Sequence, residues 1–441
     1  MSSAAATPRK TARQRGDAGG QGGGQGGSAR GSSSGLPSWL ARLDSPVTTY
    51  YVLLSATGVL VLIGLVMVLS ASAISSYVAT DSSYTIFFSQ LEFAGLGLLA
   101  LLFASRLSVS FWKRVAVPCL FGAMGLQLLV FTPLGASVNG NTNWITAGPF
   151  TMQPSEVAKV GLALSGGAVL AAKRRHLGRF WHVVVPYLLP LSAAAIGLVL
   201  LGHDLGTVIV MAAIVGGVLF AAGVPTRWFA MSGGAFAAVA AYFVVSSTNR
   251  LGRIDVWLNR SQCQPHDEQL YYGVCRQPMH GMYALADGGW WGVGLGASRE
   301  KWQWLSEPHN DFIFAIIGEE LGLPGTLVIL ALFCVLALAC YRLVLRSTDL
   351  FVRLATAGIM SWIVVQAMVN IGAVIGLLPV IGVPLPLVSS GGSSLITTMF
   401  ALGILVSFAR QEPGCATVLA ARPSVVRRSL AILPARRRRR G

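Results

Sequence analysis

The sequence predicts an all-α polytopic membrane protein with ten transmembrane helices and one long extracytoplasmic loop between the seventh and eighth helices. The first observation is composition: 54% of the 441 residues are hydrophobic and only 11% are charged, whereas soluble proteins carry roughly 25% charged residues. The second is a series of ten apolar stretches, most of them long enough for a helix to cross a hydrocarbon core of about 30 Å. The third is that Lys and Arg fall in alternate short loops.

The apolar stretches follow one another through short polar connections, except for one long interval before the eighth. They lie near residues 50–72, 86–104, 115–131, 154–172, 183–201, 205–223, 229–245, 312–341, 354–378 and 395–408. The eighth is the longest and contains Pro324 between Gly322 and Gly325. Because proline removes a helical hydrogen bond, we predict a kink there.

The charges of the short loops predict the orientation. Four loops, at 105–114, 173–181, 224–228 and 342–353, carry eleven Lys and Arg in total. The alternate loops, at 73–85, 133–153, 202–204 and 379–394, carry none. Since positive loops stay on the cytoplasmic side, both termini are expected in the cytoplasm and the long loop 246–310 outside.

The terminal segments are polar and basic. Residues 1–46 are rich in Gly and Ser and are predicted to be a disordered cytoplasmic tail, and residues 411–441 form a second basic cytoplasmic tail. The formal charge of +16 is typical of nucleic-acid binders, but no nucleic-acid-reading motif is present. Basic tails beside apolar spans are more simply held by the anionic inner leaflet, so we expect a membrane partner and no nucleic acid.

Polar clusters stand at the extracytoplasmic ends of several spans. Glu156 and Lys159 share one helix face, and they form either a structural ion pair or a site at which Lys159 meets an anionic ligand. Asp204 precedes the sixth span, where it can cap the helix, contribute to a site, or do both. The Gly/Ser segment at 384–394 has backbone N–H groups that could cradle an oxyanion.

The stretch at 301–325 brings the largest number of ionisable groups to one span. Glu307, His309 and Asp311 stand where the chain enters the eighth span, and Glu319 and Glu320 lie further along it. Charged groups at such depth usually face a cavity or a partner. The long loop is rich in Arg and Trp residues. Their side chains contact either lipid headgroups, or an anion beside an aromatic surface that binds sugar, and the sequence favours neither interpretation over the other.

Cys263 and Cys275 share the extracytoplasmic loop, an oxidising location, and are predicted to form a disulfide. No phosphate-binding loop, redox motif or metalloprotease motif is present, so no organic cofactor is expected. The residues taken alone indicate a transporter of an anionic lipid or solute, or an enzyme that acts on a lipid-linked anion.

The chain resembles the SEDS family of shape, elongation, division and sporulation proteins in five ordered segments: QPSE at 153–156 with Lys159, DLGT at 204–207, PHNDFIFA at 308–315, GEELG at 318–322 and SGGSS at 390–394. The resemblance covers about residues 47–410, and IIGEE at 316–320 with the basic tails is closest to the cell-division branch. One departure is Asn143, where the family usually has Arg.

The resemblance implies a bacterial plasma-membrane peptidoglycan glycosyltransferase at the division septum. It would polymerise lipid II into glycan strands, with a class B penicillin-binding protein and other divisome proteins as partners. A lipid II flippase and a non-catalytic scaffold remain as alternatives. A divalent cation, Mg²⁺ or Mn²⁺, could assist the leaving pyrophosphate.

The expected site is divided by role. Asp311 is expected to be catalytic, and Glu319 and Glu320 are expected to be structural. The residues expected to bind substrate are Glu156, Lys159, Asp204, Lys301, His309, Ser390, Gly391, Gly392 and Ser393.

Overall fold

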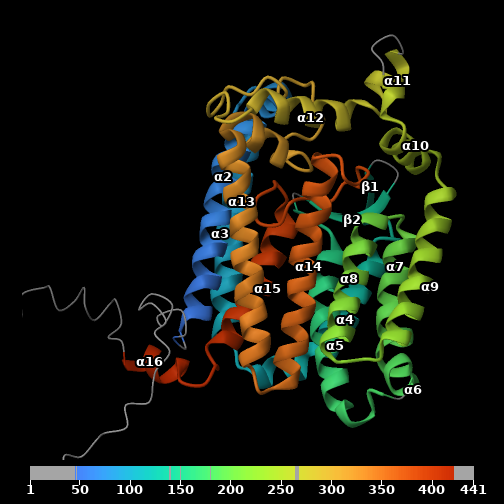
Figure 1. Ribbon diagram of the computed structural model, residues 1–441, viewed down its shortest axis with the longest axis vertical. Helices are drawn as coiled ribbons and strands as arrows, with labels where there is room; N and C mark the ends of the chain where they lie inside the picture. Colours follow the sequence, from blue (N-terminus) through green and yellow to red (C-terminus); the bar gives the residue numbers. More distant parts are fainter. Residues whose placement is uncertain are drawn as a thin grey trace, which may run out of the picture. The chain divides into compact units, whose positions relative to one another are not determined.

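The computed structural model describes residue 45 and residues 47–138, 141–148, 150–178, 180–263 and 268–421. Most of these residues are helical (Figure 1). The two predicted tails lie outside the described residues, apart from residues 45 and 411–421. The longer elements are α2 (Thr48–Thr80), α3 (Thr85–Arg106), α4 (Val109–Leu129), α5 (Pro154–Ala172), α7 (Ala194–Leu201), α8 (Leu205–Ala221), α9 (Thr226–Val245), α10 (Thr248–Leu258), α12 (Arg276–Gly288), α13 (Ile313–Arg346), α14 (Leu350–Val374) and α15 (Gly392–Ala409).

Shorter elements connect the long helices. The sheet strands are β1 (Gly135–Val138), β2 (Asn141–Ala147) and β3 (Phe150–Met152). The short helical pieces are a 3₁₀ turn at Arg174–His176, α6 (Phe180–Val183), the π-helical segment Val184–Ala193, a second 3₁₀ turn at Arg260–Gln262, α11 (Glu268–Tyr272) and α16 (Cys415–Ala421).

Each of the ten apolar stretches coincides with helical structure, and the multi-pass architecture is confirmed. Within the described residues, eight helices are long and apolar enough to cross a membrane, counting Trp181–Leu201 as one continuous span. α8 is apolar but has only 17 residues, and α4 has 21 residues with Lys113 and Arg114 near its start. The exact count of ten spans therefore stays a prediction.

Close packing of the spans depends on small residues at the crossings. α15 packs on α3, α4 on α5, and α14 on both α5 and α8. A Cβ on Gly161 of α5 would come within 2.8 Å of the Leu120 Cα on α4, and one on Gly403 of α15 within 2.5 Å of the Leu101 carbonyl oxygen on α3. Small residues allow such approach in membranes, where van der Waals contact drives association.

A small antiparallel sheet, in the order β1-β2-β3, adds to the all-α prediction (Figure 1). Its central strand pairs Ile145 with Met152 and Thr146 with Thr151. Asn143 and Ile145 are buried and alternate with more exposed neighbours, as the pleat of a strand requires. The sheet leads directly into Pro154, the first-turn proline of α5, and so fixes where that helix begins.

The long loop contains three helices, α10, α11 and α12, at one end of the helix bundle (Figure 1). The structure joins Cys263 and Cys275 by a disulfide across a separation of 12 residues. Both cysteines pack with Val256 in a small apolar cluster separate from the main core. The disulfide thus links the end of the 3₁₀ turn that follows α10 to the start of α12.

α13 is interrupted close to the predicted kink. Gly322 is non-helical, with φ 65° and ψ −160°, a conformation that favours glycine. The Val293 and Gly294 N–H groups donate to the Glu319 and Glu320 carbonyls at 2.9 and 3.0 Å. The loop before α13 therefore satisfies the carbonyl groups that the break would otherwise leave unpaired.

The basic loops meet at the opposite end of the bundle. The Lys113 ammonium group lies 2.5 Å from the Asp349 carboxylate. Arg410 donates to the Ser105 carbonyl at 2.9 Å, and Arg342 to the Ser45 carbonyl at 3.1 Å. The loops after α3, α13 and α15 are thus joined at one end, as the alternating charge pattern requires.

Candidate active site

A cavity of about 1130 Å³ lies between α5, α8, α10, α14, the start of α15, the sheet and the segment that leads into α13. It brings together clusters that are far apart in the sequence. The predicted site residues on its wall are Glu156, Lys159, Asp204, Asp311, Ser390, Gly391 and Ser393. Such a volume exceeds the roughly 300–1,000 Å³ of drug-sized ligand sites, so the cavity can accept a large substrate.

Glu156 and Lys159 form a buried ion pair in the cavity wall. The Lys159 Nζ lies 2.9 Å from Glu156 Oε1, and both side chains are less than 5% exposed. Thr397 Oγ1 donates to the other carboxylate oxygen at 3.3 Å. The geometry is that of a structural ion pair, which is one of the two interpretations of the sequence. Because the pair also lies on the cavity wall, the second interpretation, contact with an anionic ligand, stays a prediction.

Two side chains of α14 fix the position of Lys159. Lys159 donates to Gln366 Oε1 at 3.2 Å, and its ammonium group lies 4.6 Å from the centre of the Trp362 ring. The Trp362 indole N–H donates to the same Gln366 oxygen at 2.7 Å. Gln366 Nε2 in turn donates to the Pro384 carbonyl at 2.9 Å. The cation is held on several sides and has little freedom to turn.

Asp204 is the N-cap of α8 and also lines the cavity. Its Oδ1 accepts from the Thr207 N–H at 3.0 Å. Its Oδ2 accepts from Gln153 at 2.7 Å, from Thr207 Oγ1 at 2.8 Å and from Asn143 at 2.9 Å. The carboxylate is thus fully occupied by neutral donors, and its charge is stabilised without a cation.

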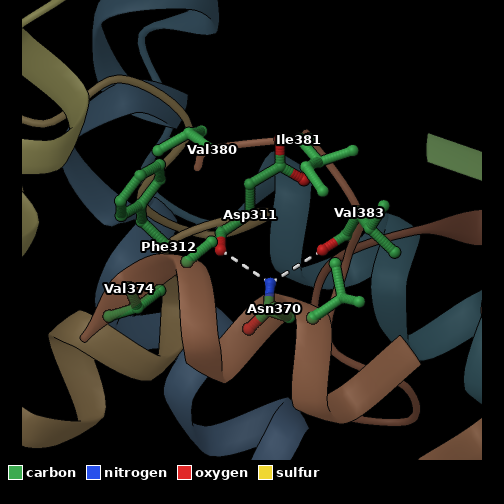
Figure 2. A pocket seen from close by; sticks show the side chains of 10 residues that line it. Asp311, Phe312, Asn370, Val374, Val380, Ile381 and Val383 are labelled. Carbon is green, nitrogen blue, oxygen red and sulfur yellow. Dashed lines mark hydrogen bonds between the residues drawn. The ribbon is translucent and has the colours of Figure 1, made fainter. Parts of the chain in front are cut away.

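Asp311 is the carboxylate best placed to act on a ligand. It is half-buried, lines the cavity, and its side chain points toward the segment at Val380 and Ile381 (Figure 2). The N-cap position of α13 is Phe312, and no side chain caps that helix end, so Asp311 is not used as a cap. Burial raises the pKa of Asp311 to about 7, with Glu307 adding to the rise and Arg253 opposing it.

Asn370 of α14 fixes the backbone at Asp311. Its Nδ2 donates to the carbonyl oxygens of both Asp311 and Val383 at 2.8 Å (Figure 2). Asn370 is buried, so loss of its amide would leave two carbonyl groups without this donor. One side chain therefore joins the entry of α13 to the segment before α15.

The Gly/Ser segment fixes the Asp311 loop from the other side. The Ser390 N–H donates to the His309 carbonyl at 2.9 Å, and Ser389 Oγ donates to the Asn310 carbonyl at 2.6 Å. The Gly391 N–H donates to Gln90 Oε1 at 3.3 Å. Two of the N–H groups expected to cradle an oxyanion are therefore already bonded within the protein. This is a correction: these two groups position the loop instead.

Several predicted substrate contacts lie off the cavity wall. The Lys301 ammonium group is buried and lies 3.0 Å from Glu320 Oε1, so its observed contact is structural. Glu319 accepts from Ser298 Oγ at 2.5 Å and from the Arg299 N–H at 2.6 Å. Both carboxylates are therefore bonded within the protein.

His309 and Gly392 also do not line the cavity. The buried His309 Nδ1 has no hydrogen-bond partner in the part of the chain that the structure describes. Burial lowers the pKa of His309, and Glu307 partly opposes this, so the ring favours its neutral form. Gly392 packs against the Phe93 ring, which a Cβ would approach to 2.7 Å.

Reasoning from the sequence missed four residues near this site. Trp362, Gln366 and Asn370 recur every four residues along α14, and Arg253 lies on the cavity wall. A polar stripe at helical spacing inside an apolar span would have identified the first three. Arg253 was noted only as one cation among several in the long loop.

The fold and the site together define a multi-pass helical membrane protein with a large polar cavity at one end of its bundle. The family model for FtsW, RodA and SpoVE, described as cell cycle protein, matches residues 51–413. The chain belongs to this family, the SEDS proteins, and its curated relatives include members named FtsW.

Several relatives match most of the chain. It is 39% identical over 385 residues to the probable peptidoglycan glycosyltransferase FtsW of Mycobacterium tuberculosis, covering 87% of this chain and 71% of that protein. It is 37% identical to the stage V sporulation protein E of Bacillus subtilis, covering 80% and 95% respectively.

Two solved structures share the fold. A chain from a peptidoglycan synthase complex, described as coordinating polymerisation and crosslinking, matches with a TM-score of 0.65 and 27% identity, covering 81% of this chain and 96% of that one. The rod shape determining protein RodA of Thermus thermophilus matches with a TM-score of 0.58 and 26% identity, covering 82% and 96%.

Proposed function

We propose that this chain is a peptidoglycan glycosyltransferase that polymerises lipid II into glycan strands during septal cell-wall synthesis. One observation carries the proposal: the half-buried carboxylate of Asp311 faces a large cavity that also presents Lys159, Arg250 and Arg253. A base beside cations suits a sugar donor that carries a pyrophosphate. The names of the FtsW relatives support the same reaction.

The proposed step forms one bond and breaks one. The hydroxyl oxygen of the acceptor sugar attacks the anomeric carbon of the donor, and the bond from that carbon to the pyrophosphate oxygen breaks. Asp311 accepts the hydroxyl proton, and undecaprenyl pyrophosphate leaves with the electron pair. Attack opposite the leaving group inverts the anomeric centre, so an α-linked donor yields a β-linked strand.

A single base is sufficient for this donor. Pyrophosphate is a good leaving group that needs charge stabilisation more than a proton, unlike the sugar leaving group of an ordinary glycosidase. The other two buried carboxylates of the cavity already have partners. Glu156 forms an ion pair with Lys159, and Asp204 accepts four hydrogen bonds. Asp311 is therefore the best candidate for the base.

A divalent cation, Mg²⁺ or Mn²⁺, would stabilise the charge of the leaving pyrophosphate when bound. In the described ranges, no three His, Cys, Asp or Glu side chains come together as a metal site. Because Mg²⁺ is usually held by one or two carboxylates together with substrate phosphates, Asp311 and Glu307 on the cavity wall are the residues that would contact such an ion. Every proposed step uses the cations of the chain itself.

The proposed setting is the bacterial plasma membrane, with both termini in the cytoplasm and the cavity facing outward. The proposed partner is a class B penicillin-binding protein, acting with other divisome proteins. The match to a chain of a peptidoglycan synthase complex supports a crosslinking partner of this kind.

The test is polymerisation of labelled lipid II by the purified full-length chain, with and without a transpeptidase partner. The wild type should make glycan polymer, and Asp311→Asn should bind the partner normally but act at least about a hundredfold more slowly, the usual scale of a general base. Asp255→Asn is the matched control, because Asp255 is exposed and lies outside the cavity. Near-normal polymer from a well-folded Asp311→Asn protein would refute the proposal.

A further inference from the structure

Two arginines of α10 lie on the wall of the cavity. Arg250 and Arg253 both line it, and residues three apart on a helix share a face. Both are half-buried. α10 therefore presents two guanidinium groups to one space.

These arginines are bonded mainly to neutral groups. Arg250 donates to the carbonyls of His203 and Phe243 at 2.6 and 2.9 Å. Arg253 donates to the Val380 carbonyl at 3.2 Å. Backbone carbonyls orient a guanidinium group but do not neutralise it, so the cations keep their full charge toward the cavity.

The two cations are close enough to repel each other. Burial lowers the pKa of Arg253, Asp311 opposes this, and Arg250 lowers the pKa further. Asp311 thus supplies a nearby negative charge for Arg253. Among the residues that the structure describes, Arg250 has no ion pair with a carboxylate. Two cations held close together repel each other, and an anion bound between them offsets that repulsion.

The other buried charged side chains of the cavity already have partners within the protein. Lys159 is paired with Glu156 at 2.9 Å, and Asp204, which keeps its negative charge, is held by amide and hydroxyl donors. Among the described residues, the two guanidinium groups of α10, beside Asp311, are therefore the Lys and Arg side chains of the cavity wall that form no ion pair. A diphosphate carries enough negative charge to balance both guanidinium groups, and the guanidinium fork matches phosphate oxygens.

Side-chain hydrogen bonds fix the position of α10 beside the cavity, where its two arginines would bind a diphosphate. The Trp257 indole N–H donates to the Gly376 carbonyl at 3.2 Å, and Arg260 donates to the same oxygen. Arg253 bonds four residues further along the same segment, at Val380. Two side chains of α10 and one of the 3₁₀ turn that follows it therefore attach this part of the chain to the segment 376–380, which leads to the Gly382 backbone beside the Asp311 carboxylate.

We propose that Arg250 and Arg253 form a clamp for the diphosphate of the lipid-linked sugar donor. This inference rests on the proposed function and specifies which cations stabilise the leaving group. The clamp lies beside the proposed base, so the donor is held with its reacting carbon near Asp311. Lys159 then serves a different part of the cavity.

Direct binding tests the clamp without requiring turnover. The full-length protein in nanodiscs is titrated with undecaprenyl diphosphate and, separately, with undecaprenyl monophosphate. Arg250→Gln and Arg253→Gln should each weaken binding of the diphosphate roughly tenfold or more, as expected for lost charged hydrogen bonds, and should weaken the monophosphate less. Arg253→Lys, which keeps the charge but loses the fork, should fall between the wild type and Arg253→Gln.

Arg299→Gln is the matched control, because Arg299 is exposed, lies off the cavity wall, and loses the same charge. It should leave both affinities unchanged. Wild-type diphosphate binding by a folded Arg250→Gln/Arg253→Gln protein would overturn the clamp, and so would equal losses for the two lipids. A protein that binds the diphosphate through these arginines but makes no polymer would instead overturn the proposed function.

Discussion

At the scale of single residues, the environment of Asp311 decides how a carboxylate can act as a base near neutral pH. An ordinary aspartate is too weak a base to take a proton efficiently, whereas the partly apolar surroundings of Asp311 raise its pKa to about 7. A base works best when its pKa lies near the working pH. That pKa already includes two neighbours of opposite charge, Glu307, which raises it, and Arg253, which lowers it.

The first prediction concerns the pH dependence of polymerisation. The base is the deprotonated form, which is present above a pKa of about 7. The rate should therefore fall by about tenfold per pH unit below that value. Glu307 raises the pKa of Asp311 and Arg253 lowers it, so Glu307→Gln should move this limb to lower pH and Arg253→Gln to higher pH. Shifts in the same direction would contradict the assignment of Asp311.

The second prediction concerns the buried ion pair. Lys159→Met keeps an unbranched side chain of nearly the same length but leaves Glu156 charged and unpaired, which should destabilise the protein by about 3–5 kcal/mol. Thermal unfolding in detergent measures this loss. The double variant Glu156→Gln/Lys159→Met should recover much of the stability but not the activity. Additive losses in the double variant would show that the two side chains do not act as a pair.

At the scale of helices and strands, apolar length was enough to locate the spans, because backbone polar groups in lipid must be satisfied within a helix. The interruption of α13 was also predictable, although the non-helical residue is Gly322 rather than Pro324. The three-stranded sheet was not predictable. Its Thr and Asn residues read equally well as a polar loop, and its strands are stabilised by pairing with each other and with the Gly202 carbonyl.

Contacts between distant segments explain the remaining differences at this scale. Lys301 was expected to meet substrate, but it pairs with Glu320 on the far side of a loop. Gln366 and Asn370 lie in a span that the sequence predicts only as apolar, yet they support Lys159 and the Asp311 backbone. Their spacing on one helix face could have marked them as residues to consider, but their partners depend on which helices pack together, which the spacing does not reveal.

The third prediction tests the polar stripe of α14. Asn370→Leu has a similar size but no donor, so the carbonyls of Asp311 and Val383 would lose a buried hydrogen bond each. The maximal rate should fall roughly tenfold or more, while KM for lipid II changes little, because the base moves but the phosphate site does not. The pH profile of the variant should shift as well.

Thr356→Val provides the control for this variant. Thr356 is buried in the same helix, and its hydroxyl has no hydrogen-bond partner in the described ranges. Rate and pH profile should therefore stay at wild-type values. An Asn370→Leu protein that loses stability but keeps the wild-type rate and pH profile would reduce Asn370 to a packing role.

At the scale of the whole molecule, charge asymmetry separates the two ends of the bundle. One end collects the basic loops, and the other carries the cavity, the disulfide and the helices of the long loop. That the basic loops share one end was predictable from the alternation of the eleven loop cations. The cavity itself was not, because it depends on how helices, strands and loops from distant parts of the chain meet rather than on any one of them.

The fourth prediction concerns orientation in the membrane. Reporter fusions after Gln277 should report an extracytoplasmic location, and fusions after Arg410 a cytoplasmic one. The physical reason is the retention of positive loops on the cytoplasmic side. The opposite location at either position would reverse the proposed placement of the cavity.

The size of the cavity has a consequence for inhibitor design. At about 1130 Å³, it offers more room than one drug-sized molecule fills. A compound at Lys159 and a second compound at Asp311 could therefore be bound together. Joining them by a linker of matching length would make the second contact intramolecular, which can raise overall affinity by about 10²–10⁴ without any new contact. Fragments that are too weak alone thus become useful starting points.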